Sequence, residues 1–175
     1  MKNLLCLVAV LGLAAGCATK PPPTATTIDP ITGARTDVSE NLLNDTNSTP
    51  REVVYLNLFR EYRSAKRVNY YLEVFYMAPT DAGYLEIPPG QTLTLTADGQ
   101  PLKFDGNGSL NRRRPYRKDF VRENAIYEVT KQDLQKLANA KKIKVQIRGN
   151  NGLVERDFAP ENFDNLKAFV ARAAT

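Results

Sequence analysis

An Asp-Gly pair separates two stretches of alternating apolar and polar residues and sharply narrows the folds open to this chain. Leu93 and Leu95 precede Asp98-Gly99, and Leu102 and Phe104 follow it. Asp-Gly is favoured in the two-residue type I′ turn of a β-hairpin. Such a turn sets Leu95 opposite Leu102 and Leu93 opposite Phe104, so both apolar pairs share one face. The pattern predicts a hairpin with one buried face.

A second hairpin is predicted near residue 150. Residues 142–148 alternate between charged or polar and apolar side chains, which is typical of a half-buried strand. The residues that follow leave two registers open. A turn centred on Asn150-Asn151 pairs Ile147 with Val154, whereas a turn centred on Asn151-Gly152 has better turn chemistry but places Arg156 against Ile147.

The rest of residues 51–175 alternates between expected strands and two expected helices. Residues 52–59, 68–77 and 119–129 are rich in β-branched and aromatic residues, which favours strands, although Val54, Leu58 and Tyr62 would also fit a helix in the first of them. Residues 105–118 are expected to form a polar loop. Thr130 and Asp133 resemble a capping box at the start of a short helix. A last helix is expected from Pro160, with a buried stripe formed by Phe163, Leu166, Phe169, Val170 and Ala173.

These elements predict an α+β fold. We expect a mainly antiparallel sheet with two hairpins, a short helix and a C-terminal amphipathic helix packed on one face. A β-sandwich or a partly open barrel with a packed helix is the alternative.

The N-terminus reads as an export signal. A positive start at Lys2 is followed by an apolar run from Leu4 to Leu13, which is too short to span a bilayer. The run ends in Leu13-Ala14-Ala15-Gly16-Cys17, which resembles the lipobox of bacterial lipoproteins. The resemblance covers residues 1–17 only and carries no information on the remainder of the chain.

The resemblance implies that residues 1–16 are removed and that Cys17 carries lipid. Two or three acyl chains would anchor the protein firmly, because each buried CH₂ contributes roughly 0.8 kcal/mol. Ala18 is not the Asp that often retains such proteins on the inner membrane, so the resemblance implies the periplasmic side of the outer membrane. Residues 17–50 are rich in Thr, Pro, Asn and Asp, and are expected to form a flexible tether, part of which docks on a single domain at 51–175.

The densest charge cluster suggests an anionic partner. Residues 51–175 contain 21 Lys and Arg against 15 Asp and Glu, a mild positive excess that favours anions without pointing to nucleic acid. Arg112, Arg113, Arg114, Arg117 and Lys118 follow a Gly-rich stretch, and arginine forks suit phosphates and carboxylates. In the alternative interpretation these residues form a solvated loop and pair with Asp119 and Glu123.

Composition limits the chemistry that the domain can carry out. The chain has no His, and its two Cys, Cys6 and Cys17, both belong to the N-terminal 17 residues, so no Cys/His metal site and no His-dependent nucleophile is expected. Carboxylate-based glycan hydrolysis stays open through Glu73, Glu86, Glu123 and Glu128. We expect a non-catalytic envelope lipoprotein without cofactor or metal, which binds an envelope protein or an anionic envelope polymer. An adaptor for peptidoglycan or lipopolysaccharide and a glycan hydrolase are the alternatives.

Overall fold

A computed structural model describes residues 25–45, 52–64 and 67–173. The elements in chain order are β1 (Ala25–Ile28), β2 (Arg35–Asp45), β3 (Val53–Ser64), β4 (Arg67–Pro79), β5 (Gly90–Ala97), β6 (Gln100–Gly106), the 3-10 helix η1 (Leu110–Arg112), β7 (Arg113–Tyr116), β8 (Phe120–Val129), α1 (Lys131–Asn139), β9 (Ile143–Gly149), β10 (Gly152–Asp157) and α2 (Pro160–Ala173). The strands expected at 52–59, 68–77 and 119–129 are thereby confirmed as β3, β4 and β8.

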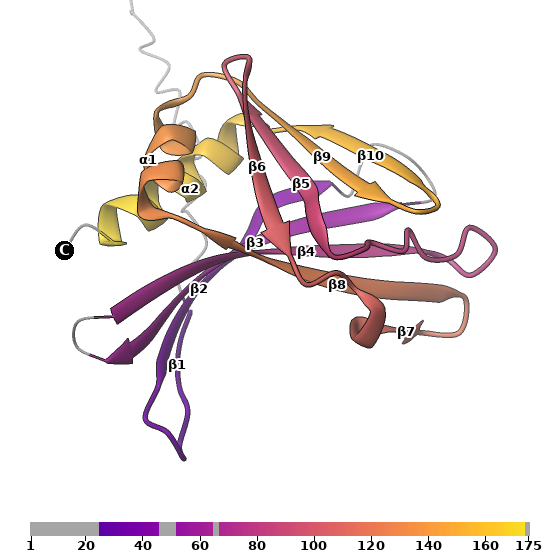
Figure 1. Cartoon of the computed structure of the whole chain (residues 1–175), viewed down its shortest axis with the longest axis horizontal. Helices are drawn as coiled ribbons and strands as arrows, with labels where there is room; N and C mark the ends of the chain where they lie inside the picture. The colour runs from indigo at the N-terminus through magenta and orange to yellow at the C-terminus, as the bar shows by residue number, and fades with distance from the viewer. Residues whose placement is uncertain (1–24, 46–51, 65–66, 174–175) are drawn as a thin grey trace, which may run out of the picture.

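One antiparallel sheet of ten strands dominates the described part of the chain (Figure 1). The strands follow the order β1-β2-β3-β4-β8-β6-β5-β9-β10, and β7 pairs with β8 outside this path. The prediction of a mainly antiparallel α+β fold with a C-terminal helix is confirmed. The sheet is larger than the two expected hairpins, because it also contains the long strands β2, β3, β4 and β8 and the short strands β1 and β7.

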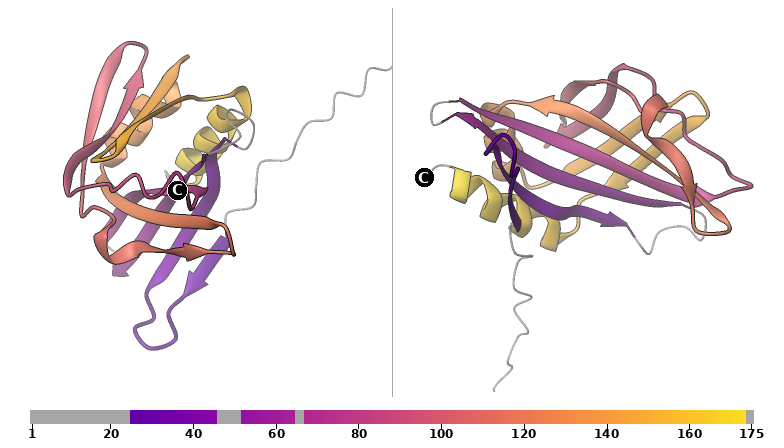
Figure 2. Two further views of the ribbon diagram at one scale, coloured as in Figure 1. Left: turned by 90° about the vertical axis from the view of Figure 1, so that its right-hand side faces the viewer. Right: turned by 90° about the horizontal axis from the view of Figure 1, so that it is seen from below.

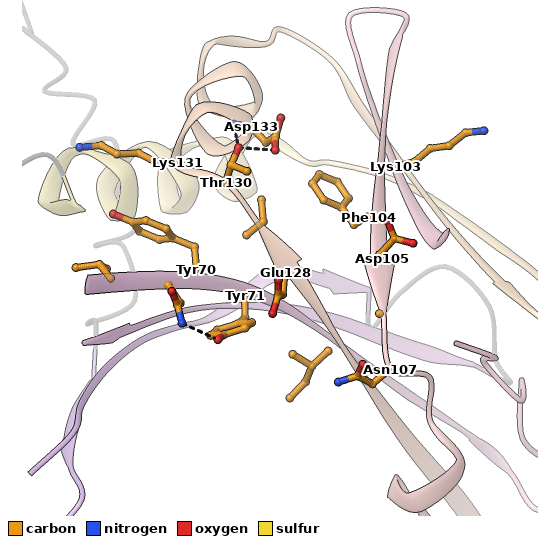
Figure 3. Close-up of a pocket in the computed structure, with 15 residues that line it drawn as sticks. Tyr70, Tyr71, Lys103, Phe104, Asp105, Asn107, Glu128, Thr130, Lys131 and Asp133 are labelled. Atoms are coloured by element: carbon orange, nitrogen blue, oxygen red, sulfur yellow. Dashed lines mark hydrogen bonds between the residues drawn. The ribbon is translucent and has the colours of Figure 1, made fainter. Parts of the chain in front are cut away.

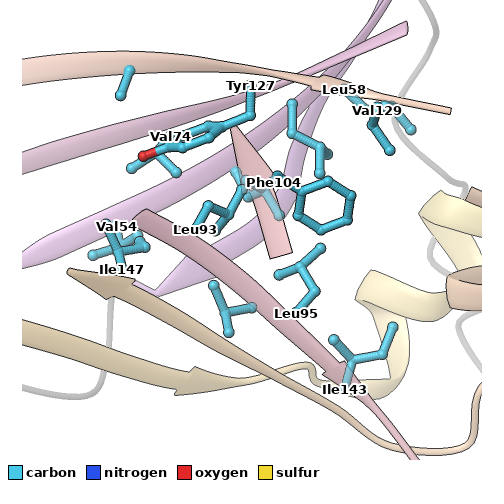
Figure 4. Packing of buried hydrophobic residues seen from close by; sticks show 14 of the residues in the cluster. Val54, Leu58, Val74, Leu93, Leu95, Phe104, Tyr127, Val129, Ile143 and Ile147 are labelled. Atoms are coloured by element: carbon cyan, nitrogen blue, oxygen red, sulfur yellow. The ribbon is translucent and has the colours of Figure 1, made fainter. Parts of the chain in front are cut away.

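The sheet folds over on itself at the boundary between β6 and β8. These two strands pair through one residue pair, Gly106 with Tyr127, and then diverge. The half that contains β5, β6, β9 and β10 lies over β3, β4 and β8 (Figure 1). Fully buried side chains from both halves fill the space between them, as Figure 4 shows for Val54, Val74, Leu93, Leu95 and Ile147. We call this side of β3, β4 and β8 the inner face and the opposite side the outer face.

Both predicted hairpins are present. In β5–β6, Leu95 pairs with Leu102 and Leu93 with Phe104, as the Asp-Gly turn predicts. In β9–β10, Val154 pairs with Ile147, so the turn is centred on Asn150-Asn151.

Tertiary contacts explain the register of the second hairpin. The backbone N–H of Asn150 donates to the carbonyl oxygen of Glu86 at 3.0 Å, and that of Asn151 donates to the carbonyl oxygen of Leu85 at 3.2 Å. Gly149 passes so close to Leu85 that a Cβ atom there would collide with the Leu85 backbone. The segment around Leu85 therefore holds the turn in place and overrides the local preference for Asn-Gly.

The expectation of a flexible tether at 17–50 is wrong for β1 and β2. β2 pairs with β3, with Asp37 opposite Arg60 and Val38 opposite Phe59. Part of this stretch therefore docks on the domain, as anticipated, and a buried ion pair contributes to the attachment. Cys17 and residues 18–24 and 46–50 lie outside the described residues.

A buried ion pair attaches β2 to the sheet. The Asp37 side chain is 1% exposed and accepts hydrogen bonds from Arg60 Nη2 at 2.6 Å and Arg35 Nε at 3.0 Å. Burial raises the pKa of Asp37, but hydrogen bonds from Arg60, Thr26 and Arg35 lower it by more, so that the pKa falls below its ordinary value. Arg60 also donates to the carbonyl oxygen of Arg172 at 2.9 Å, which ties β3 to the end of α2.

The two helices lie together on one side of the molecule (Figure 1). The Thr130 side chain accepts a hydrogen bond from the backbone N–H of Asp133, which confirms the predicted cap of α1. In α2, Leu166 and Phe169 are buried while Phe163 and Val170 are partly buried, so the expected stripe is confirmed for these four residues. No helix in the described ranges has both the length and the apolar character needed to cross a membrane.

Candidate functional site

The predicted basic residues gather on one substructure, which we call the arginine hairpin and define as residues 110–124. Arg112 ends η1, Arg113 and Arg114 start β7, and Arg117 and Lys118 lie in the turn before β8. The expectation of a polar loop over 105–118 is wrong here, because 110–116 contains a helical turn and a strand. Residues 113–116 form a strand because they pair with β8, a partner that the sequence of this segment does not reveal.

Arg113 belongs to a buried polar cluster that holds the arginine hairpin in place. The Glu123 side chain is 0% exposed, and its carboxylate accepts hydrogen bonds from the Ser109 hydroxyl and from the backbone N–H of Glu86, the latter at 2.9 Å. Arg113 Nε lies 3.5 Å from Glu123 Oε2 and donates to Ser109 Oγ at 3.1 Å. The alternative in which the arginines pair with Glu123 is therefore confirmed for Arg113, whose role is structural.

Within the described part of the chain, the other basic residues of the arginine hairpin lack carboxylate partners. Among the described residues, no ion pair involves Arg112, Arg114, Arg117, Lys118 or Arg122. Arg112, Arg114, Arg117 and Lys118 are exposed, and Arg122 is half-buried. The hairpin thus presents five unneutralised charges on a backbone that Arg113 and Glu123 fix.

Arg114 and Arg122 lie directly opposite each other on β7 and β8. Like charges in this position repel each other and destabilise the strand pair. The Arg122 guanidinium lies 5.0 Å from the ring centre of Phe75 and 5.7 Å from that of Tyr116, and its Nε is buried without a hydrogen-bond partner among the described groups. Aromatic rings stabilise a guanidinium without neutralising it, so a bound anion would relieve the repulsion.

A small cavity adjoins the arginines of η1 and β7 on the outer face. Its volume is about 290 Å³, and it is lined by Glu73, Asn111, Arg112, Arg113, Arg114 and Asn124. Glu73 is the only acidic residue in this lining, and it already accepts hydrogen bonds from Asn57 Nδ2 at 3.1 Å and Asn124 Nδ2 at 2.9 Å. The arginine side of the cavity suits the oxygens of a phosphate or a carboxylate.

A larger groove opens where β6 and β8 diverge (Figure 3). Its volume is about 930 Å³, and both charges occur along it, with Lys103 and Asp105 on β6, Glu128 on β8, and Lys131 and Asp133 on α1. Tyr70 and Tyr71 of β4 add aromatic surface (Figure 3). This balance of charges gives the groove no preference for an anion.

The tyrosines do not form one shared face. Tyr76 and Tyr127 are buried in the core, where burial raises the pKa of both hydroxyls, that of Tyr127 to about 12. Tyr70 and Tyr71 line the groove, whereas Tyr116 contacts Arg122 on the outer face.

The acidic residues considered for hydrolysis are dispersed or engaged. Glu123 is buried in the cluster with Ser109, Glu73 is held by two asparagines, and Glu86 lies 3.8 Å from Arg113. Glu128 lies apart from them in the groove. No group of three or more His, Cys, Asp or Glu side chains able to hold a metal occurs in the described portion of the chain.

Two residues of the site escape prediction from the sequence, Arg122 and Ser109, whereas Glu123 was anticipated as an arginine partner but not as a buried one. The spacing of Arg122 and Asn124 marks one strand face, but only the pairing with β7 shows that Arg122 faces Arg114. No protein-family model matches the sequence, and comparison with curated proteins and with solved structures likewise gives no match.

Proposed function

We propose that this chain is a non-catalytic cell-envelope lipoprotein whose domain binds an anionic partner through the arginine hairpin. In this proposal lipid on Cys17 holds the protein on the periplasmic side of the outer membrane. The observation that supports anion binding most strongly is the placement of Arg114 opposite Arg122 with no carboxylate partner for either among the described residues. A protein that needed these residues only for solubility would not require them to face each other.

The physical chemistry favours a ligand rich in phosphate or carboxylate oxygens. A guanidinium donates two parallel hydrogen bonds to such groups, and bonds to charged groups contribute about 1.5–3 kcal/mol each. Two envelope polymers carry such groups: lipopolysaccharide carries phosphates, and peptidoglycan carries carboxylates. An acidic protein surface is the remaining candidate. The adaptor function is thus one form of the same proposal.

Binding of defined anions tests the proposal. Full-length lipidated protein in neutral detergent micelles is titrated with purified lipopolysaccharide, purified sacculi and inorganic pyrophosphate at several salt concentrations. We expect salt-sensitive binding to at least one of the three, weakened roughly 10-fold to 100-fold when Arg112→Gln and Arg114→Gln are combined.

Two other exposed basic residues provide the matched control. Lys141 and Arg148 lie outside the arginine hairpin, on the β9 half of the sheet. The combined Lys141→Gln and Arg148→Gln changes remove the same charge, so they should leave specific binding nearly unchanged. Equal losses of binding affinity in both double variants would show that only net charge matters and would contradict the proposed site.

The lipid anchor has its own test. The Cys17→Ser change should abolish lipid labelling and leave the protein unprocessed or soluble, because the thioether needs the cysteine sulfur. Protein with this change that is still cleaved and stays in the membrane fraction after a carbonate wash would contradict the lipoprotein assignment.

Release of soluble fragments from sacculi by the wild-type protein would contradict the non-catalytic assignment and favour the hydrolase alternative.

A further inference from the structure

The turn between β1 and β2 exposes two large apolar side chains. Ile28 is 63% exposed and Ile31 is 92% exposed, and both lie at the projecting end of this hairpin (Figure 1). Single apolar residues are common on protein surfaces, but two at one projecting tip form a small exposed apolar patch.

The tip is ordered by its own hydrogen bonds. The backbone N–H of Asp29 donates to the carbonyl oxygen of Ala34 at 2.9 Å, and that of Gly33 donates to the carbonyl oxygen of Asp29 at 2.8 Å. Asp29 Oδ1 accepts from the backbone N–H of Ile31 at 2.8 Å. Because the tip is already ordered, contact with a partner costs little conformational entropy there.

The covalent chain allows this tip to lie on the same surface as the proposed anchor. Seven residues lie between Cys17 and Ala25, and the eight Cα–Cα steps from one to the other span at most about 29 Å. The four residues of β1 cover about 13 Å from Ala25 toward the tip. The connection is therefore long enough for the tip to touch the same bilayer surface that holds Cys17.

The tip projects on the same side of the molecule as η1 and β7. Figure 1 and the left view of Figure 2 both show the β1–β2 turn and the arginine hairpin on the side facing away from α1 and α2. A membrane that touches the tip would thus lie on the same side as the arginine hairpin.

We infer that the β1–β2 tip is a second membrane contact, which inserts Ile28 and Ile31 into the interfacial layer and turns the arginine hairpin toward lipid phosphates. This inference rests on the proposed lipid anchor and names the anionic partner of the proposed function as the phosphate headgroups of the membrane itself. Two isoleucines bind a bilayer weakly on their own, but the anchor makes their insertion an intramolecular step at high effective concentration. The Asp29 charge keeps the tip at the boundary between the headgroups and the acyl chains, within reach of both.

Depth-dependent fluorescence quenching tests the inference on the lipidated protein. By the lipoprotein assignment, Cys6 leaves with the leader and lipid occupies the Cys17 sulfur, so an introduced cysteine is the only free thiol. The variants Ile31→Cys, Leu110→Cys and Gln100→Cys each carry one fluorophore, at the tip, on η1 and at the distant β5–β6 turn. Each is reconstituted in vesicles of phosphatidylcholine, with or without phosphatidylglycerol, that contain either acyl-brominated or headgroup-labelled quencher lipids.

We expect acyl-brominated lipids to quench the probe at position 31 several-fold more strongly than the probe at position 100. Headgroup quenchers should act on the probe at position 110, more strongly with phosphatidylglycerol present, and adding Arg112→Gln and Arg114→Gln should remove that increase. Adding Ile28→Ser to Ile31→Cys should reduce quenching of the tip probe several-fold, because Ile28 is exposed and its change leaves the core intact.

The outcomes separate the inference from the proposed function. Equal, weak quenching at positions 31 and 100, in protein that floats with the vesicles, overturns the membrane contact while lipid anchoring and pyrophosphate binding stand. If the probe at position 31 is quenched but the probe at position 110 does not respond to phosphatidylglycerol or to the arginine changes, the tip contact is supported and lipid phosphate is overturned as the partner. Protein that fails to float with vesicles shows that the anchor is absent, which overturns both.

Discussion

Arg113 on β7 lies opposite Glu123 on β8, with its Nε 3.5 Å from an oxygen of a carboxylate that solvent does not reach. Its neighbour Arg114 is exposed and faces Arg122 instead. Two adjacent arginines therefore have different roles, because successive side chains of a strand point to opposite faces. One stabilises the hairpin, and the other is available to a partner.

Substitution of each arginine should separate these roles. We expect Arg113→Gln to lower the free energy of unfolding by about 1–3 kcal/mol, because a buried carboxylate loses a charged donor but keeps its bonds to Glu86 and Ser109. Arg114→Gln should change it by less than about 0.5 kcal/mol. Urea unfolding followed by circular dichroism measures both. Similar values for the two variants would show that Arg113 is not an anchor.

Acid should weaken the attachment of β2. The pKa of Asp37 is lowered in the folded state, since hydrogen bonds from Arg60, Thr26 and Arg35 outweigh the effect of burial. Its contribution to stability is therefore complete above the unfolded pKa of about 3.9 and is lost as the pH falls through the lower, folded pKa. We expect the free energy of unfolding to fall below about pH 4 in the wild type and to fall less steeply in Asp37→Asn. Identical slopes would contradict this role of Asp37.

Removal of the first two strands should destabilise the domain even though they precede the sheet core. A chain that begins at Arg51 leaves Arg60, whose side chain is 9% exposed, without Asp37. Loss of one partner from a pair whose other partner stays buried costs about 3–5 kcal/mol, and the cost is smaller here because removal of β2 also uncovers Arg60. A chain that begins at Thr24 retains the pair and is the control. Thermal unfolding of the two truncated chains should show the difference, and equal midpoints would mean that β1 and β2 are accessory.

The β5–β6 register predicts unequal costs for neighbouring residues. Leu95 is fully buried opposite Leu102, whereas Thr94 is half-buried on the other face of the strand. We expect Leu95→Ala to cost about 2–5 kcal/mol and Thr94→Ala clearly less. Denaturant titration of the two variants provides the comparison, in which equal costs would be inconsistent with the register.

Local sequence patterns were sufficient where a structural element depends on its own residues. Asp98-Gly99 and the alternation on either side of it determined the β5–β6 pairing, and Thr130 with Asp133 determined the start of α1. Turn chemistry and side-chain periodicity act over a few residues, so they can be read without knowledge of the fold. The basic cluster was visible in the same way, as a set of residue types.

The tertiary structure decided what depends on distant partners. β2 pairs with β3 in the sheet, and its Asp37 meets Arg60, 23 positions away. The position of the turn at Asn150-Asn151 is fixed by hydrogen bonds to Leu85 and Glu86. Pairing with β8 directs Arg113 toward Glu123 and Arg114 toward Arg122. Burial of a charge is favourable only when a complementary group reaches it, and no local pattern records that group. The sequence by itself therefore determined β3, β4, β8 and the strands of the two hairpins, the helix starts and the chemistry of the basic cluster. The fold added β1, β2 and β7 and determined which charges are anchors and which are free.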